Sequence, residues 1–230
     1  DYSRLVHFDP FSMRLTMREY SLSKPDPYPL RTYAETEQST PPKSAFNQLL
    51  ENIVQVNEHE HLFVSLIVRP HQREWSSPFK NPSDRLHEAA EIEIQKIVGS
   101  KGDMRGLSKS TQALVHSIES GLNKPSFDCG IRALYIADRR GYDEARASSL
   151  DEIFEPFGDA DLNGFSAYDP RLNVGWPLNE IFAVAPVLAM NYLLNLYRRR
   201  AYFAPPYYGK VFVLNTEELA TVYHIPHIQR

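Results

Sequence analysis

The sequence has a single cysteine, Cys129, among its 230 residues. One cysteine cannot form an intrachain disulfide, and it excludes a zinc site built from several cysteines. A reducing, cytoplasmic environment therefore fits the chain best. The chain begins with Asp1 and opens with neither the basic nor the apolar segment of a signal peptide, so we expect a fragment of a longer protein.

Basic charge is also scarce. The 25 Lys and Arg residues are outnumbered by 29 Asp and Glu residues, which gives a formal net charge of -4. DNA-binding domains usually carry a basic excess, so we expect no nucleic acid contact by this domain as a whole. Hydrophobic residues make up 42% of the chain, enough for one sizeable domain or two small ones that bury roughly 70% of the unfolded surface.

Glycine-rich phosphate-binding loops are missing. A Walker loop needs glycines whose backbone N–H groups surround the phosphates, followed by Lys and then Ser or Thr. Gly209 and Lys210 are followed by Val211, and no glycine lies five residues before this pair. The motifs G-x-G-x-x-G and G-x-S-x-G are absent too, so we expect no catalytic residue, no nucleotide site and no cofactor in this chain.

No apolar run is long enough to cross a membrane. Residues 181–190 are apolar, but a span needs about 20 such residues. Asn191 and Asn195 interrupt the continuation on one helical face, which is typical of a helix partly buried in protein. Three arginines follow, which we interpret as a solvated helix end able to contact phosphate locally: Arg198, Arg199 and Arg200.

Hydrophobic periodicity predicts an alternation of strands and helices. Strands are expected at residues 11–22, 61–70, 127–137 and 210–215. Helices are expected at residues 44–54, 83–97, 110–122, 143–154 and 177–202. Within the strands, we expect Leu66, Val68 and Ile131 to lie in the buried core.

This order of elements predicts an α+β domain with a ferredoxin-like or split βαβ sheet whose helices cover one face. A degenerate internal duplication of the two halves is a further option, although no residue-level repeat supports it. We expect residues 1–44 to form a strand and an extended proline-rich arm, residues 45–214 the α+β domain, and residues 215–230 a junction segment.

One acidic loop is similar to a calcium-binding loop. Asp159, Asp161 and Asn163 occupy the first, third and fifth positions of an EF-hand loop, and Gly164 occupies the sixth. The twelfth position is Pro170, where a calcium loop needs its bidentate glutamate. We therefore favour a solvated turn over a weak calcium site.

Two histidines are candidates for a second metal site. His59 and His61 lie on the same side of an extended segment, and imidazoles are common zinc ligands. A zinc site needs further ligands, and His71 lies beyond the other end of the same strand. We interpret the pair as part of an exposed turn and expect no metal.

The last segment predicts a short capped helix. Asn215 or Thr216 can accept hydrogen bonds from the free N–H groups of the first turn, which also holds two glutamates that complement the helix dipole. Leu219, Val222 and Tyr223 then share one face. We predict that these three residues contact a following domain, with packing on their own domain as the alternative.

Four stretches follow one another in a particular order: YPLRTYAE at residues 28–35, EHLFVSLIVRP at 60–70, KPSFDCGIRALYIA at 124–137 and LNTEELATVYHIP at 214–226. Together they resemble the N-terminal domain that precedes the motor in type IV secretion coupling-protein ATPases of the HerA/FtsK-like superfamily, particularly those of candidate-phylum bacteria. Ile225 stands where this family usually has Phe.

The resemblance implies a non-catalytic assembly or regulatory domain of a membrane-associated ATPase that moves DNA or protein in type IV secretion and conjugation. It implies three partners, namely the C-terminal ATPase domain of the same polypeptide, secretion-channel proteins and further copies of the chain in a homo-oligomer. It also implies a cytoplasmic location at the inner face of the membrane, through an anchor outside this fragment. The alternative is a stand-alone soluble binding domain with a weak calcium loop.

Overall fold

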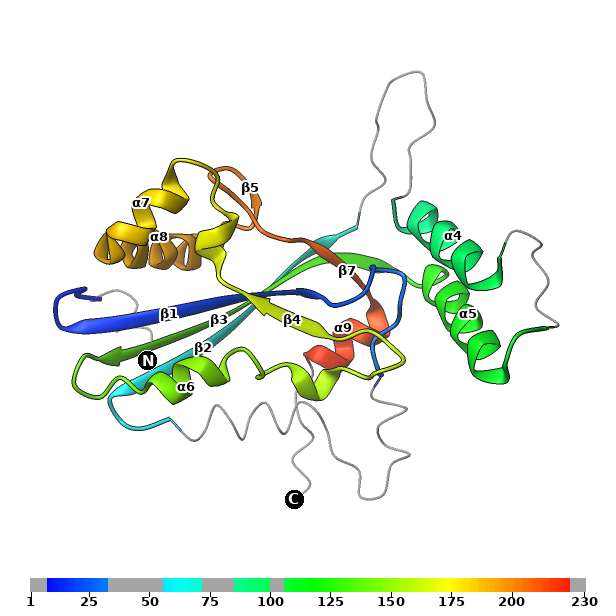
Figure 1. Ribbon diagram of the computed structural model, residues 1–230, viewed down its shortest axis with the longest axis horizontal. Coiled ribbons are helices and arrows are strands. Elements are labelled where there is room, and N and C mark those ends of the chain that lie inside the picture. The colour runs from blue at the N-terminus through cyan, green and yellow to red at the C-terminus, as the bar shows by residue number, and fades with distance from the viewer. Residues whose placement is uncertain (1–7, 33–55, 72–84, 100–105, 224–230) are drawn as a thin grey trace.

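A five-stranded antiparallel sheet forms the centre of the protein (Figure 1). The computed structural model describes residues 8–32, 56–71, 85–99 and 106–223. The strands are β1 (Met13–Leu22), β2 (Glu60–Pro70), β3 (Ser126–Asp138), β4 (Phe165–Tyr168) and β7 (Phe212–Asn215). Their order is β2-β3-β1-β4, and β7 pairs with the first residues of β3.

β3 is the central strand, and nearly all of its 13 residues are buried. Successive side chains of a strand point to opposite faces of the sheet. Ile131, Ala133 and Tyr135 accordingly pack into one core cluster, whereas Leu134 and Ile136 pack into a second cluster on the other face. An apolar strand of this kind requires cover on both sides.

β3 has one partner along one edge and two successive partners along the other. β2 pairs with it from Glu60 to Pro70. On the opposite edge, β1 pairs with the second half, beginning with Tyr20 opposite Ile131. β7 pairs with the first residues, where Phe212 lies opposite Cys129. The expected N-terminal segment therefore supplies an inner strand of the main sheet.

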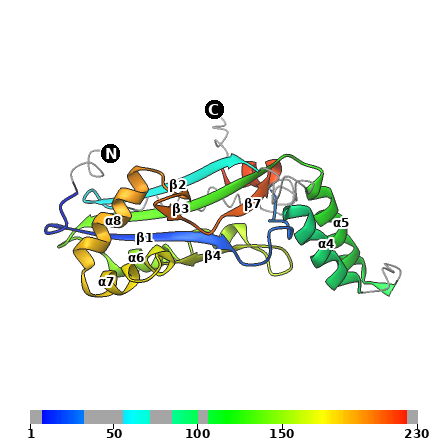
Figure 2. The same cartoon turned by 90° about the horizontal axis from the view of Figure 1, so that it is seen from above.

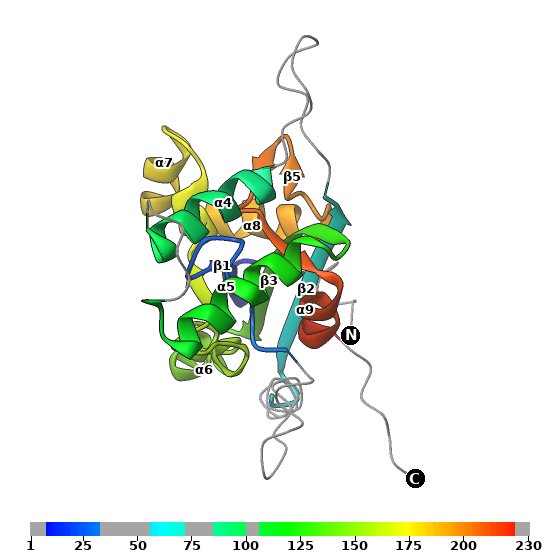
Figure 3. The ribbon, with the colours of Figure 1, turned by 90° about the vertical axis from the view of Figure 1, so that its right-hand side faces the viewer.

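Helices lie on both faces and beyond one end of the sheet (Figure 2). They are α4 (Arg85–Val98), α5 (Lys109–Leu122), α6 (Glu144–Ser149), α7 (Leu178–Val184), α8 (Pro186–Arg198) and α9 (Thr216–Val222). In the end-on view of Figure 3, α8 and α6 lie on opposite sides of the strands. α4 and α5 project from the end opposite to α7 (Figure 1).

Short elements complete the two faces. The 3-10 helix η2 (Glu155–Phe157) continues the cover that α6 begins, because Phe157 is buried in the same cluster. The 3-10 helix η3 (Pro170–Asn173) contacts α7 and α8. The hairpin of β5 (Phe203–Ala204) and β6 (Tyr207–Tyr208) adds Tyr207 to the cluster between α7 and α8.

The α+β class is confirmed, but the detailed architecture differs from the expected one. A split βαβ unit contains a parallel pair of strands, whereas every pairing among the described strands is antiparallel. The helices cover both faces of the sheet instead of one. The reason is that β3 is apolar on both sides, so each side needs its own packed layer.

The long helix expected over residues 177–202 is two helices, α7 and α8, which meet at Ala185 and Pro186. Proline has no N–H to donate and disfavours a helical conformation of the residue before it. Ala185 accordingly has φ -125° and ψ 72°. The helix expected over residues 143–154 likewise ends early, at Ser149. The helix expected over residues 44–54 lies outside the described residues.

The three core predictions have different outcomes. Ile131 is fully buried, and Leu66 is half-buried against the same cluster. The prediction for Val68 is wrong, because its side chain is 39% exposed. Val68 lies near the end of β2, where the last three residues of the strand are all exposed.

A buried ion pair joins β1 to β3. Glu19 and Arg132 are both fully buried, and Arg132 Nε donates to Glu19 Oε1 at 2.5 Å. Two tyrosines donate to the other oxygen of Glu19, Tyr168 from β4 at 2.6 Å and Tyr207 from β6 at 2.7 Å. Arg132 Nη1 also donates to the carbonyl of Leu196 on α8. These contacts tie α8 and the β5-β6 hairpin to the sheet.

Candidate functional site

A cleft of about 1070 Å³ lies between α4 and the end of the sheet formed by β2, β3 and β7. Its walls are partly apolar, with Ile92 from α4 and Val213 from β7. Charged and titratable side chains from four separate parts of the chain also line it: Asp26, Arg69, His71, Arg85, Glu88 and Asp128. Such a mixture of apolar walls and a few converging polar groups is typical of a binding site.

Asp128 is the centre of an ionic network in the cleft. Its Oδ2 accepts from Arg69 Nε at 2.8 Å, and its Oδ1 lies 2.6 Å from His71 Nδ1. The register of the sheet creates this contact, because Arg69 lies directly opposite Asp128 in the β2–β3 pair. The guanidinium carbon of Arg69 also lies 4.5 Å from the centre of the Phe203 ring, a cation–π contact.

Asp26 enters the cleft from the segment after β1. Burial raises the pKa of Asp26 from its ordinary value of 3.8 to about 6, against the lowering effects of the Val213 N–H group, Arg85 and His71. A carboxyl group with a pKa near 6 gains or loses its proton close to neutral pH. Groups with such shifted values are concentrated in functional clefts.

The cleft is suited to binding a polar ligand or peptide with charges of both signs. His71 and Asp128 form a pair of the kind that orients a general base. Among the described residues that line the cleft, there is no serine, threonine or cysteine for such a base to activate. Within the described ranges, no three His, Cys, Asp or Glu side chains are grouped so that they could hold a metal ion.

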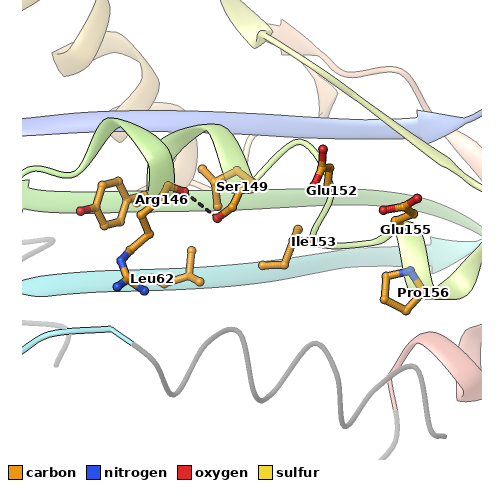
Figure 4. A pocket seen from close by; sticks show the side chains of 9 residues that line it. Leu62, Arg146, Ser149, Glu152, Ile153, Glu155 and Pro156 are labelled. Carbon is orange, nitrogen blue, oxygen red and sulfur yellow. Dashed lines mark hydrogen bonds between the residues drawn. The ribbon is translucent and has the colours of Figure 1, made fainter.

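A second pocket, of about 320 Å³, lies between α6 and the strands β2 and β3 (Figure 4). Arg146 reaches toward β2, whereas Glu152 and Glu155 point the other way (Figure 4). Arg146 Nε lies 3.2 Å from Glu60 Oε2, and the Tyr135 hydroxyl donates to Glu60 Oε1 at 2.5 Å. The charge of Arg146 is thus balanced by a buried carboxylate of the sheet.

The residues of the calcium-like loop have structural partners. Asn163 is fully buried, and its Oδ1 accepts from the backbone N–H groups of Lys24 and Gly164, each at 2.9 Å. Asp159 and Asp161 are exposed, and Asp159 Oδ1 accepts from the backbone N–H of Asp161 at 3.0 Å. Lys24 Nζ donates to the carbonyl of Asp161 at 2.9 Å. A lysine ammonium group therefore contacts this loop, and both lone pairs of the Asn163 oxygen are used.

The other candidate residues lie apart. His59 is exposed, whereas His61 is half-buried and stacks on Phe63. His71 lies at the far end of β2, in the cleft. Arg198, Arg199 and Arg200 are exposed at the C-terminal end of α8.

α9 begins where the sequence predicts it, and Asn215 and Glu218 form a capping box. Of the three residues expected to contact a following domain, Val222 is buried in the core of this domain. Leu219 packs half-buried against the same core, and Tyr223 is 66% exposed. The apolar face of α9 thus packs mainly on its own domain, and Tyr223 alone of the three is presented to solvent.

An exposed apolar surface surrounds α7. Six large side chains from η3, α7, α8 and the loop between η3 and α7 form this surface, which we name the apolar corner: Leu172, Trp176, Leu178, Ile181, Val184 and Leu188. Trp176 and Val184 are each 83% exposed, and Leu172 is 80% exposed. η3, α7 and α8 contact one another, so these side chains lie on one part of the surface, and exposed apolar patches often mark an interaction site.

A family model for a domain of unknown function, DUF8128, matches residues 14–230. The chain belongs to this family. No curated protein and no solved structure matches it. The matched range includes all described strands and helices apart from the first residue of β1. None of the helices in the described part of this DUF8128 domain has both the length and the hydropathy that a membrane crossing requires.

Sequence reasoning missed both the cleft and the apolar corner of the DUF8128 domain. The cleft has no local motif, because Asp26 and Asp128 come from distant segments. The apolar corner did leave a signal. Between Arg171 and Arg198, Glu180 is the only charged residue, which is unusual for a segment whose helices are short and lie at the surface.

Proposed function

We propose that this domain is the non-catalytic assembly or regulatory domain of an ATPase that moves DNA or protein in a type IV secretion-like system. In this proposal the ATPase domain follows α9 in the same polypeptide, and an anchor outside these residues holds the protein at the inner face of the membrane. Secretion-channel proteins and further copies of the chain are its other proposed partners. The basis is the resemblance of the four sequence stretches.

The position of these stretches in the fold supports the proposal. The second and third stretches form β2 and β3, which pair along their whole length. The fourth contains the end of β7, which pairs with the start of β3, and continues into α9. The first stretch reaches the fourth through the backbone N–H of Leu30, which donates to Glu218 Oε1 at 2.9 Å. The described parts of the four stretches thus contact one another, as expected for segments that define a common domain.

The attachment of α9 is the observation that carries the regulatory part of the proposal. Glu218 bonds to Leu30, Val222 is buried, and Lys124 Nζ pairs with Glu217 Oε2 at 2.7 Å. Tyr223 follows directly at the end of this fixed helix. A contact made by Tyr223 would have a defined orientation relative to the sheet, which a domain needs if it is to influence a neighbour.

The experiment is the substitution Tyr223→Asp in the full-length gene product, with Phe11→Asp as the matched control. Both aromatic side chains are exposed, by 66% and 78%, and Phe11 lies just before β1. We expect Tyr223→Asp to weaken assembly or lower the ATPase rate about tenfold, because tyrosines are frequent hot spots of interfaces. Thermal unfolding of the isolated domain should stay unchanged. Equal activity of both variants and the wild type would contradict the proposal.

A stand-alone binding domain is the second candidate, and the charged cleft of about 1070 Å³ favours it. The calcium loop is not part of this candidate, because the side-chain oxygen of Asn163 already accepts two backbone hydrogen bonds. An open reading frame that stops directly after Arg230 would favour this candidate over the first.

A further inference from the structure

The last turn of α7 is apolar on all sides and yet buries little of its surface, whereas the first turn carries Asn179 and Glu180. The last four residues of α7, from Ile181 to Val184, are all apolar, and four consecutive residues point to every side of an α-helix. Phe182 is buried between α7 and α8, whereas Ile181 is 37% exposed and Val184 is 83% exposed. A helix that is apolar all round is normally enclosed on all sides, by protein or by lipid. The outer side of the last turn of α7 therefore has no packed layer over its apolar side chains.

The length of the apolar run favours a position in the membrane interface. Residues 181–190 are too few to cross a bilayer, for which about 20 are needed. A run of this length is otherwise typical of a buried core helix or of an interfacial segment. The exposure of Ile181, Val184 and Leu188 excludes the core helix within this domain. Trp176, which is 83% exposed beside them, belongs to the residue type most enriched at membrane interfaces.

The charge around the apolar corner favours an anionic surface over a neutral one. Residues 172–216, which include the whole apolar corner, contain four basic residues and one acidic residue, Glu180 on α7, although the chain as a whole has a net charge of -4. Leu188, Asn191, Asn195 and Arg198 are all exposed and recur at spacings of three and four, so they share the outward face of α8. This face runs from an apolar end to a basic end. Basic residues next to an apolar contact are attracted by anionic lipid headgroups.

We propose that the apolar corner docks on the surface of an anionic lipid bilayer. Trp176 and Val184 would enter the boundary between headgroups and acyl chains, and Arg198 and Arg199 would contact lipid phosphates. The contact is peripheral, and it requires no transmembrane segment. The inference does not rest on the proposed motor function, because it uses only the exposed side chains and the charges of this domain.

The test uses the intrinsic fluorescence of Trp176. The chain has two tryptophans, and the substitution Trp75→Phe leaves Trp176 as the only one. Vesicles of phosphatidylcholine with phosphatidylglycerol should shift the Trp176 emission to shorter wavelength and should sediment with the protein. Vesicles of phosphatidylcholine alone should bind several-fold more weakly, and the variant Arg198→Gln/Arg199→Gln should lose most of this difference.

The variant Trp176→Ser/Val184→Ser should bind the anionic vesicles at least about tenfold more weakly in co-sedimentation. The matched control is Val68→Ser, which removes a 39% exposed apolar side chain near the end of β2. It should bind like the wild type. Circular dichroism should show all variants folded, since the substituted side chains lie at the surface.

Three results would overturn the proposal. The first is the absence of vesicle binding by the wild type. The second is equal binding by Trp176→Ser/Val184→Ser and the wild type. The third is a concentration-dependent dimer in ultracentrifugation that Trp176→Ser/Val184→Ser abolishes while vesicles leave the Trp176 emission unchanged. That result would assign the apolar corner to a second copy of the chain.

Discussion

Removing the buried carboxylate of Glu19 should destabilise the domain more than any surface substitution. Glu19 accepts hydrogen bonds from Arg132, Tyr168 and Tyr207, and both members of the ion pair are fully buried. In Glu19→Gln, Arg132 keeps its charge in the core without a counterion. Breaking a buried ion pair by removing one partner costs about 3–5 kcal/mol. A domain of this kind has a total stability of about 5–15 kcal/mol, so the loss is a large share of it.

Urea denaturation followed by circular dichroism measures this loss. The control is Arg14→Gln, which breaks the surface pair with Glu144, whose side chains are 44% and 70% exposed. It should change the free energy of unfolding by at most about 1 kcal/mol. The double variant Glu19→Gln/Arg132→Met should lose less than the sum of the two single variants, because it leaves no charge unpaired. A loss below about 1 kcal/mol for Glu19→Gln, or strict additivity, would refute the reasoning.

Three further predictions concern stability. Burial raises the pKa of Asp26 to about 6 and that of Glu218 to about 7, so the folded state favours their protonated forms. Their contribution is complete below pH 4 and is lost as the pH rises through the two shifted pKa values, so the free energy of unfolding should fall by about 6 kcal/mol up to pH 7. Thermal denaturation at a series of pH values measures this fall, and the double variant Asp26→Asn/Glu218→Gln should show a smaller one. A wild-type stability that rises between pH 4 and pH 7 would contradict the prediction. Asn163→Ala should lower the free energy of unfolding, measured in urea, by about 2 kcal/mol, because it leaves buried backbone groups without partners. A loss under about 0.5 kcal/mol would show that the hydrogen bonds of Asn163 contribute little to stability. Leu66→Ala should lower the free energy of unfolding by about 1–2 kcal/mol, and Val68→Ala should lower it by less than about 0.5 kcal/mol, because Val68 is the more exposed of the two. Equal losses for the two variants would contradict this difference in burial.

The sequence predicts the elements of this fold better than their assembly. β1, β2 and β3 are visible in the sequence because their apolar residues alternate or form continuous runs. The start of α9 is visible because Asn215 and Glu218 have the spacing of a capping box. The assembly depends on pairings between distant segments, for example Tyr20 opposite Ile131, and no local pattern encodes them.

The wrong predictions have physical causes that a short stretch of sequence does not contain. Val68 has the same alternating pattern as Leu66, but it lies near the exposed end of β2. The apolar run continues across Pro186 and therefore predicts one long helix, whereas the helical backbone breaks there. Asn163 fits a calcium loop by spacing, yet its side chain is used to join two loops. In these three cases the exposed end of a strand, a backbone restriction and a tertiary contact, respectively, override the local pattern.

The candidate site was largely invisible for the same reason. Asp26, Arg69 and Asp128 meet only because β2 pairs with β3 and the chain after β1 returns to the same end of the sheet. The apolar corner could have been found, because the segment around Trp176 and Val184 combines many apolar residues with a single charge. The expectation that this segment is partly buried was reasonable for α8, but α7 has too little protein around it.

The proposed role as a domain of a translocating ATPase is tested most directly by reading the gene beyond the codon for Arg230. The account predicts that the same reading frame continues and soon encodes a glycine-rich loop followed by Lys and Ser or Thr, the sequence that binds nucleotide phosphates. A stop codon directly after Arg230, or a continuation without such a loop, would contradict it.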